Sequence, residues 1–225
     1  MVEIRTPTEI IRPTTKQKLL GCWIQDNLKW TEHLRDNEES LIKSLNKRLN
    51  ALKIITRVSD FKTRKNIGEG IFLSKLIYMI SVWSGCAKDL LNSIQTIQNR
   101  AAKQITKNYW VENSETHLAQ LGWLSVNQLS EYHNMLLIHQ VKKNGTPQYL
   151  YEMYNWEYNY ATRQAVSNQI KPKGIPRLDI SLKTYRWRAV SYYNRVPGYI
   201  TQIEDKRKFK VQLKNWVQTN VPFKP

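Results

Sequence analysis

The sequence predicts a mainly α-helical protein, a helical bundle preceded by a short β stub at its N-terminus. Apolar residues recur at intervals of three and four through most of the chain beyond residue 31, which is the spacing of one helical face. Ser, Thr, Gly and Pro residues lie where these periodic stretches begin and end. Two short extended patterns lie within the first 24 residues.

The predicted β stub consists of two extended segments. The first includes residues 2–4 and residues 9–11, and the second covers residues 18–24. Pro13 and the two threonines after it are typical of a turn between the segments. We therefore expect two short strands within the first 30 residues.

Helices are expected along most of the remaining chain. The first begins after Thr31, which has the chemistry of an N-cap, and its inward residues are Leu34, Leu41, Leu45, Leu49, Leu52 and Ile55. Further helices are predicted at residues 62–81, with Gly68 and Gly70 as weak points, and at 88–107, 114–121, 125–144, 147–154, 181–194 and 206–218. Residues 155–180 lack periodicity and are predicted to form a linker or an exposed loop.

The composition indicates a folded protein with a polyanionic partner. Of the 225 residues, 41% are hydrophobic and 11% are aromatic, which argues against a disordered basic tail. The chain carries 35 Lys and Arg against 18 Asp and Glu, a net charge of +17. From residue 161 onward there are 14 basic and 3 acidic residues, so the excess is concentrated in the last third. Nucleic acid is the partner that this charge favours.

Several protein classes are excluded by the same features. Cys22 and Cys86 lie 64 positions apart without metal-ligand spacing, which excludes a disulfide scaffold and a zinc module. The first ten residues lack the apolar core of a signal peptide. The longest apolar stretch, residues 71–83, contains Lys75 and is too short to cross a bilayer. We therefore expect an intracellular protein, in the nucleus or the cytoplasm, without a membrane partner.

Cations on the first long predicted helix form the first candidate site. Four of them fall within a sector of about 120° at 100° per residue. Such a stripe can follow the phosphates of a nucleic acid, and it can equally be an ordinary solvated face. The candidates are Lys43, Lys47, Lys53 and Arg57, with Arg100 and Lys103 on the later helix over 88–107.

Two clusters that mix aromatic and basic residues form the second candidate site. Six aromatic residues lie between positions 149 and 160, and the run YRWR occupies positions 185–188. Aromatic faces beside cations are typical of single-stranded nucleic-acid binding, and helix packing is the alternative for each aromatic residue. The candidate contacts are Arg163, Arg186, Trp187, Arg188 and Arg195.

The sequence contains no recognisable active site. Its acidic residues are scattered, it has no Gly-rich phosphate loop, and no histidine lies beside a plausible nucleophile. We therefore expect no catalytic residue, no metal ligand and no cofactor in this chain.

Six motifs, in order, resemble the C-terminal part of the reverse transcriptases of non-LTR (jockey-like) retrotransposons. KLLGCWI at 18–24, followed by NLKWTEH at 27–33, is similar to the end of the family's palm and the entry into its thumb. The other motifs are IQNRAA at 97–102, LGWLS at 121–125, YATR at 160–163, YNRVP at 193–197 and FKVQLKNW at 209–216. Tyr193 and Val196 depart from the family's "trp-asn-x-leu-pro" pattern. The resemblance covers about residues 10–223.

The resemblance implies a division of the chain. Residues 1–30 would be the end of the palm, residues 31–110 a thumb-like helical bundle, and residues 111–154 a helical extension. Residues 155–180 would be a linker, and residues 181–225 a basic C-terminal helical region. Leu20 and Gly21 would then lie in the strand near the primer end.

The resemblance also implies a function without catalysis. In the family, carboxylates of the palm hold Mg²⁺, and they include an Asp-Asp pair that this sequence lacks. The chain is then a fragment of an RNA-directed DNA polymerase that binds template–primer RNA or DNA through phosphates and is no enzyme on its own. A polypeptide carrying the palm would be a further partner. The alternative is a helical protein-interaction module derived from a reverse transcriptase, without a nucleic-acid role. DNA or RNA preference and oligomeric state stay open.

Overall fold

The computed structural model describes residues 4–5, 10–11, 14–156, 169–176 and 178–224. Helices dominate, which confirms the predicted mainly α fold. The first helical layer contains α1 (Leu41–Ile55), α2 (Phe61–Ile67), α3 (Ser74–Ile77), α4 (Ile80–Trp83) and α5 (Lys88–Thr106). The chain continues through α6 (Ser114–Leu121), α7 (Val126–Asn144), α8 (Gln148–Tyr151), α10 (Asp179–Leu182), α11 (Tyr185–Tyr193), α12 (Gly198–Thr201) and α13 (Lys206–Asn220).

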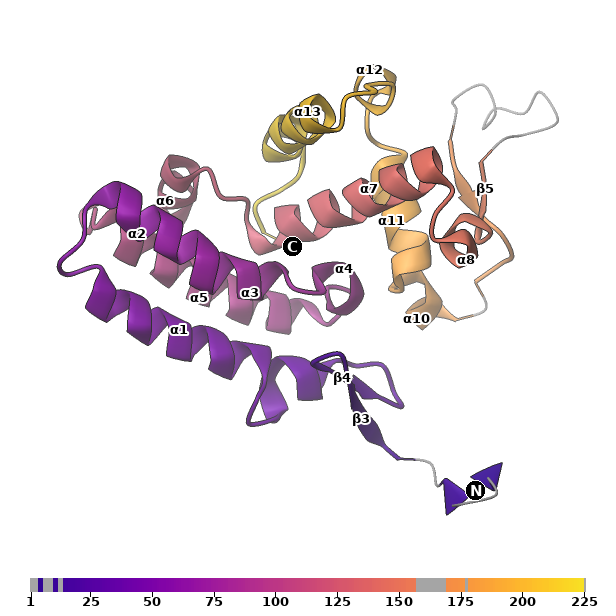
Figure 1. Ribbon diagram of the computed structural model, residues 1–225, viewed down its shortest axis with the longest axis horizontal. Coiled ribbons are helices and arrows are strands. Elements are labelled where there is room, and N and C mark those ends of the chain that lie inside the picture. The colour runs from indigo at the N-terminus through magenta and orange to yellow at the C-terminus, as the bar shows by residue number, and fades with distance from the viewer. Residues whose placement is uncertain (1–3, 6–9, 12–13, 157–168, 177, 225) are drawn as a thin grey trace.

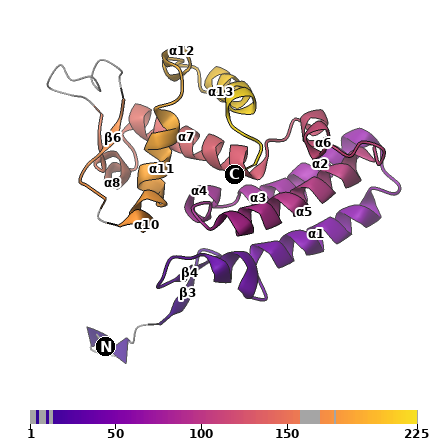
Figure 2. The same cartoon turned by 180° about the vertical axis from the view of Figure 1, so that it is seen from behind.

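Two groups of helices share one core. Helices α1 to α5 lie side by side, and α7 leads away from them to α11 and α13, which pack against it (Figure 1). Seen from behind, α5 and α1 lie next to each other within the first group (Figure 2). A continuous hydrophobic cluster extends from Leu34 to Val221 and has the fully buried Phe72, Trp83 and Phe209 among its members.

The N-terminal strands differ from the prediction. Strand β1 (Ile4–Arg5) pairs with β2 (Ile10–Ile11), close to the expected segments. The single strand expected over residues 18–24 is wrong, because β3 (Lys16–Leu19) and β4 (Cys22–Gln25) form an antiparallel hairpin there. Leu20 and Gly21 have positive φ angles of 48° and 78° and make the turn. Glycine adopts this conformation without steric cost, so Gly21 reverses the chain instead of extending it.

The first helix is interrupted where the sequence predicted continuity. A single π-type turn covers Glu32–Asp36, and Asn37 then leaves the helix with extended backbone angles. Thr31 has helical backbone angles and makes no capping bond, so its predicted N-cap role is wrong. Helix α1 starts afresh after Ser40.

The predicted helix over 62–81 is broken twice. The segment Gly68–Leu73 is π-helical, in agreement with the weak points expected at its two glycines. A Cβ on Gly68 would lie 2.4 Å from Cδ1 of Ile105, so glycine allows this segment to approach α5 closely. Met79 then adopts a left-handed conformation, which separates α3 from α4 and was not predicted.

Three further boundaries need correction, while α5, α7 and α13 match their predictions closely. Asn113, not Ser114, caps α6 by accepting the N–H of Glu115. Helix α8 ends at Tyr151, and Tyr154 instead begins strand β5 (Tyr154–Asn155), which pairs with β6 (Lys171–Pro172). The helix expected over 181–194 is divided into α10 and α11. The described part of the predicted linker is largely exposed, with Ile175 at 87%, but it is anchored by the β5–β6 pairing and by Ile170, which is only 3% exposed.

A buried polar network joins α5 to the start of α7. Gln98 is fully buried, and its side-chain amide donates to the carbonyl of Leu124 at 2.9 Å. Gln95 donates to the side chains of Gln98 and Asn99 at 3.0 and 2.7 Å and accepts the N–H of Val126 at 2.7 Å. Buried polar groups cost stability unless they are paired, so these bonds fix the position of α7 against α5.

Replacing Gln98 with Leu should destabilise the protein by about 1–3 kcal/mol, because the carbonyl of Leu124 and an amide of Gln95 lose their buried partner. Urea unfolding measures the change. Asn92→Leu on the exposed side of the same helix is the control, and it should shift the unfolding free energy by no more than about 0.5 kcal/mol. Equal effects of both variants would contradict a structural role of the network.

Two buried histidines should make stability depend on pH. Burial, with Lys75 as a second cause, lowers the pKa of His33 to about 4. Burial, aided by Lys143 and Lys142, lowers that of His139 to about 4. The unfolded chain binds more protons than the native protein between pH 4 and 6.5, so stability should fall as the pH drops through this window. His139→Gln should reduce the slope by up to about 1.4 kcal/mol per pH unit in urea unfolding at pH 7, 6 and 5. An unchanged slope would contradict the assignment.

Candidate nucleic-acid interface

The cations predicted to form one stripe on α1 lie on two different flanks of that helix. Lys53 lines a groove between α1 and α5, together with Arg100 and Lys103. Lys47 lies on the other flank, next to the β3–β4 hairpin, in a hollow that it shares with Lys18. Arg57 is exposed beyond the end of α1 at Ile55, so it does not continue the helical face.

The flank next to the hairpin is electrostatically mixed. Lys43 forms an ion pair with Glu38 at 2.8 Å, and Lys18 pairs with Glu39. Hydrogen bonding and the charge of each lysine lower the pKa of its partner carboxylate, so both glutamates are ionised at neutral pH. A phosphate approaching Lys43 or Lys47 would therefore meet negative charge as well as positive.

The groove between α1 and α5, which we call the α1/α5 groove, has a more uniform charge. Its volume is about 560 Å³, and its lining contains the three cations Lys53, Arg100 and Lys103. No carboxylate lies within 4.0 Å of these cations in the part of the chain that the structure describes. Side-chain amides, one tyrosine and one leucine complete the lining, from Asn46, Asn50, Gln104, Tyr109 and Leu49. Ammonium, guanidinium and amide groups are the usual donors to phosphate oxygens.

Hydrogen bonds and packing hold the two walls of the groove in place. The side-chain amide of Gln104 on α5 donates to the hydroxyl of Thr56 at the end of α1, at 2.8 Å. Arg64 donates to the carbonyl of Ile105 at 2.8 Å and to that of Ser59 at 2.7 Å, which joins α2 to both neighbours. The groove is thus formed mainly by two fixed helices, and only Tyr109 of its lining lies outside them.

Two exposed aromatic residues follow α5, and the sequence analysis missed them. Tyr109 lines the groove and is 54% exposed, and Trp110 is 95% exposed. Lys107 ends α5 in a left-handed conformation, after which this pair leaves the helix. The sequence does contain a signal for them. The two aromatic residues follow soon after the last apolar residue of the helical repeat, so they do not belong to the buried face of that helix.

Most of the predicted contacts in the C-terminal third serve the fold. Arg188 is 8% exposed and donates to the hydroxyl of Ser84 at 2.8 Å and to the carbonyl of Ser81 at 2.9 Å. It joins α11 to α4 and does not face the surface, so we remove it from the candidate contacts. Arg186 donates to the carbonyl of Lys173.

The remaining predicted residues of this third are also accounted for. Arg195 pairs with the buried Glu131. Burial raises the pKa of this carboxyl group above its ordinary value, and the charge and hydrogen bond of Arg195 oppose part of the rise. Trp187 is half-buried, and Arg163 lies outside the described residues.

The aromatic cluster between residues 149 and 160 packs largely on itself. Trp156 stacks on Tyr151 with ring centres 5.0 Å apart and meets the edge of Tyr154 at 5.3 Å. Tyr154 is buried, whereas Tyr149 is 64% exposed. The tyrosines at positions 158 and 160 lie outside the described residues. Among the described residues of the cluster, Tyr154 and Trp156 are therefore packed, whereas Tyr149 and Tyr151 are exposed.

The predicted primer-end residues occupy the tip of the hairpin. The side chain of Leu20 is 76% exposed, and its carbonyl accepts the hydroxyl of Tyr78 at 2.7 Å. Gly21 lies in the same hollow as Lys47 and Lys75, about 20 residues before α1 begins. The hairpin is therefore attached to the break between α3 and α4.

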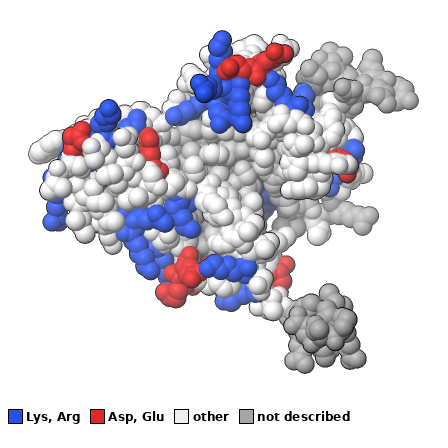
Figure 3. Space-filling view, in the orientation of Figure 1, with Lys and Arg blue, Asp and Glu red and all other residues white. Residues whose placement is uncertain are grey.

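Lys and Arg side chains are unevenly spread over the surface. Figure 3 shows two gatherings on one face, one over α13 and one along α1, each next to acidic side chains. Among the described residues, no three His, Cys, Asp or Glu side chains gather in a way that could hold a metal ion. Both Cys22 and Cys86 are free thiols. Within the described ranges, no helix has the length and apolar character needed to cross a bilayer.

Comparison of the chain with protein-family models, with curated protein sequences and with solved structures gave no significant match.

Proposed function

We propose that this chain binds nucleic acid through the phosphate backbone, with the α1/α5 groove as the main contact surface. The observation that carries the proposal is the concentration of Lys53, Arg100 and Lys103 in one groove whose lining contains no carboxylate. Because phosphates carry no sequence information, the binding is sequence-independent and sensitive to salt.

The resemblance to reverse transcriptases supports the same surface. The motif at 97–102 places Gln98 and Asn99 next to Arg100, and these neighbours have different roles in the structure. Gln98 is buried in the network that holds α7, whereas Arg100 is exposed and lines the groove. The proposed role is that of a template–primer binding region, which positions a duplex without doing chemistry.

The aromatic pair supplies a second kind of contact. Tyr109 lines the groove and Trp110 follows it in the sequence; both rings are exposed, and a ring of this kind can stack on an unpaired base. The groove would then hold phosphates while the pair contacts a single-stranded template next to the duplex.

The triple variant Lys53→Gln, Arg100→Gln, Lys103→Gln should weaken binding to an RNA–DNA primer–template and reduce the slope of log K against log salt by about 3. Fluorescence anisotropy at several salt concentrations measures both quantities. For the intact protein, about six phosphate contacts would lower the affinity about a thousandfold between about 50 and 200 mM salt.

The matched control removes the same charge from the mixed flank. Lys18→Gln, Arg35→Gln, Lys43→Gln also replaces two lysines and one arginine, each of which pairs with a carboxylate. Its salt slope should change by less than about 1, because these charges are already neutralised locally. An equal loss in both variants would mean that net charge, and not the groove, drives binding. No binding by the intact protein would favour a protein-interaction module.

Trp110→Ala should weaken binding to a primer–template with a single-stranded overhang by about fivefold to a hundredfold and leave a blunt duplex unaffected. Folding should be unchanged, since the side chain is 95% exposed. Tyr149→Ala removes another exposed aromatic ring, from the cluster between residues 149 and 160, and should have no effect. The reverse result would move base stacking to that cluster.

A further inference from the structure

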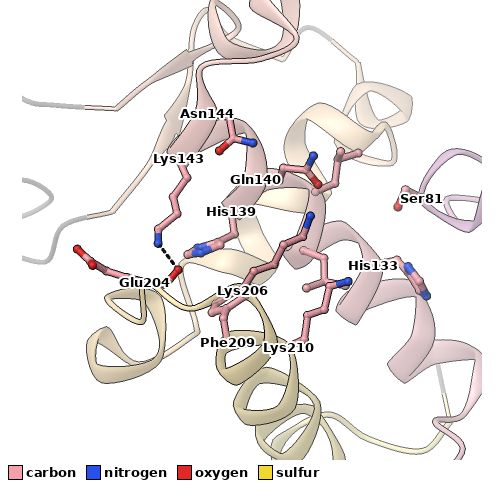
Figure 4. A pocket seen from close by; sticks show the side chains of 12 residues that line it. Ser81, His133, His139, Gln140, Lys143, Asn144, Glu204, Lys206, Phe209 and Lys210 are labelled. Atoms are coloured by element: carbon pink, nitrogen blue, oxygen red, sulfur yellow. Dashed lines mark hydrogen bonds between the residues drawn. The ribbon is translucent and has the colours of Figure 1, made fainter.

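A second groove lies between α7 and α13, on the far side of α7 from α5. Its volume is about 530 Å³, within the range of small-molecule sites. Figure 4 shows its lining, which comes mainly from one face of α7 and the first turns of α13, with Ser81 of α4 and Glu204 before α13. None of the residues of the α1/α5 groove takes part in it.

The wall formed by α7 is apolar at its centre and polar at its edge. Leu136 and Leu137 are half-buried there, whereas Phe209 on α13 is only 1% exposed. The ring of His139 stacks on Phe209 with centres 3.6 Å apart, and both of these rings are buried. Gln140 lies one helical turn further along α7 and is exposed, so its side-chain amide can donate and accept at the rim.

The wall formed by α13 carries two ammonium groups. Lys206 and Lys210 are four residues apart on one helical face, and both side chains extend across the groove toward α7 (Figure 4). Glu204 is the one carboxylate of the lining, and it points away from both ammonium groups (Figure 4). Lys143 is engaged elsewhere, since it donates to the carbonyls of Glu204 and Ile203 at 2.9 and 3.3 Å.

We propose that the α7/α13 groove binds a nucleoside phosphate, with the phosphate between Lys206 and Lys210 and the base on the apolar wall of Leu136 and Leu137. An inorganic anion would bind the two cations but would make no contact with the apolar wall. An aliphatic anion would leave the amide of Gln140 without a partner. A nucleoside phosphate has an anionic group, a flat apolar face and a polar edge, so it matches all three features.

The charge environment of the neighbouring histidines agrees with this placement. Burial lowers the pKa of His133, and the charge of Lys210 lowers it further. For His139 the second and third causes after burial are Lys143 and Lys142. Both rings therefore sense the positive potential of the groove and can report on an anion that enters it.

The experiment titrates AMP into the protein at pH 7 and follows the ring resonances of His133 and His139 by NMR. We expect both to shift and to saturate together. Lys206→Gln, Lys210→Gln should weaken AMP binding by at least about tenfold, since two charge-assisted hydrogen bonds are lost. Lys208→Gln is the control on the same helix, because Lys208 lines a different surface hollow and not this groove. It should bind AMP as the wild type does.

Inorganic phosphate and a single-stranded oligonucleotide complete the test. Phosphate should bind at least about tenfold more weakly than AMP, because it cannot use the apolar wall. If the groove binds one nucleotide of a nucleic-acid strand, a pentanucleotide should produce the same histidine shifts as AMP. If the groove binds a free mononucleotide, only AMP should produce them. No saturable shift with either nucleotide probe, equal binding of phosphate and AMP, or an equal loss in Lys208→Gln would overturn the proposal. The Lys53, Arg100, Lys103 variant should bind AMP normally, so this result is independent of the proposed function.

Discussion

The junction between α5 and the turn before α7 is the constraint on which the two halves of the protein depend. The backbone groups of Leu124 and Val126 are buried there, at a turn where no helix or strand can pair them. Gln98 and Gln95 supply the missing partners from the side of α5. Helix α5 packs on α1, α2 and α6, so this junction transmits the geometry of the first helical layer to α7 and to the helices that pack against α7.

The same helix carries both the internal network and the exposed cations. Residues 95, 98 and 102 of α5 are buried, whereas Arg100 lies on the outer face. Because a helix turns by about 100° per residue, two neighbours in the sequence can serve the core and the surface. A motif that combines buried and exposed residues can therefore be required for folding at some positions and for binding at others.

The elements with complete local signals could be predicted from the sequence, and those that depend on distant contacts could not. Helix α7 has the Ser125–Gln128 capping box and a left-handed Gly145 at its end, and its bounds follow from these residues. The break at Met79 and the hairpin turn at Leu20 place non-glycine residues at positive φ, which only tertiary contacts can enforce. Helical spacing singled out Lys53 as a surface cation, but its proximity to Arg100 and Lys103 depends on the packing of α1 on α5 and could not be predicted. The burial of Arg188 was not, because its partner Ser84 lies 104 positions away.

The anchoring of the segment after α13 has a consequence for the order of events during synthesis. Side chains at the start of α7 bind backbone carbonyls beyond α13: Gln128 donates to Val221, and Asn127 donates to Pro222, both at 3.0 Å. The first of these bonds joins residues 93 positions apart. These two bonds can form only after residue 222 has been translated. Until then the start of α7 is held by its capping box and by the bond from Val126 to Gln95 of α5, so the chain end completes the anchoring of α7 last.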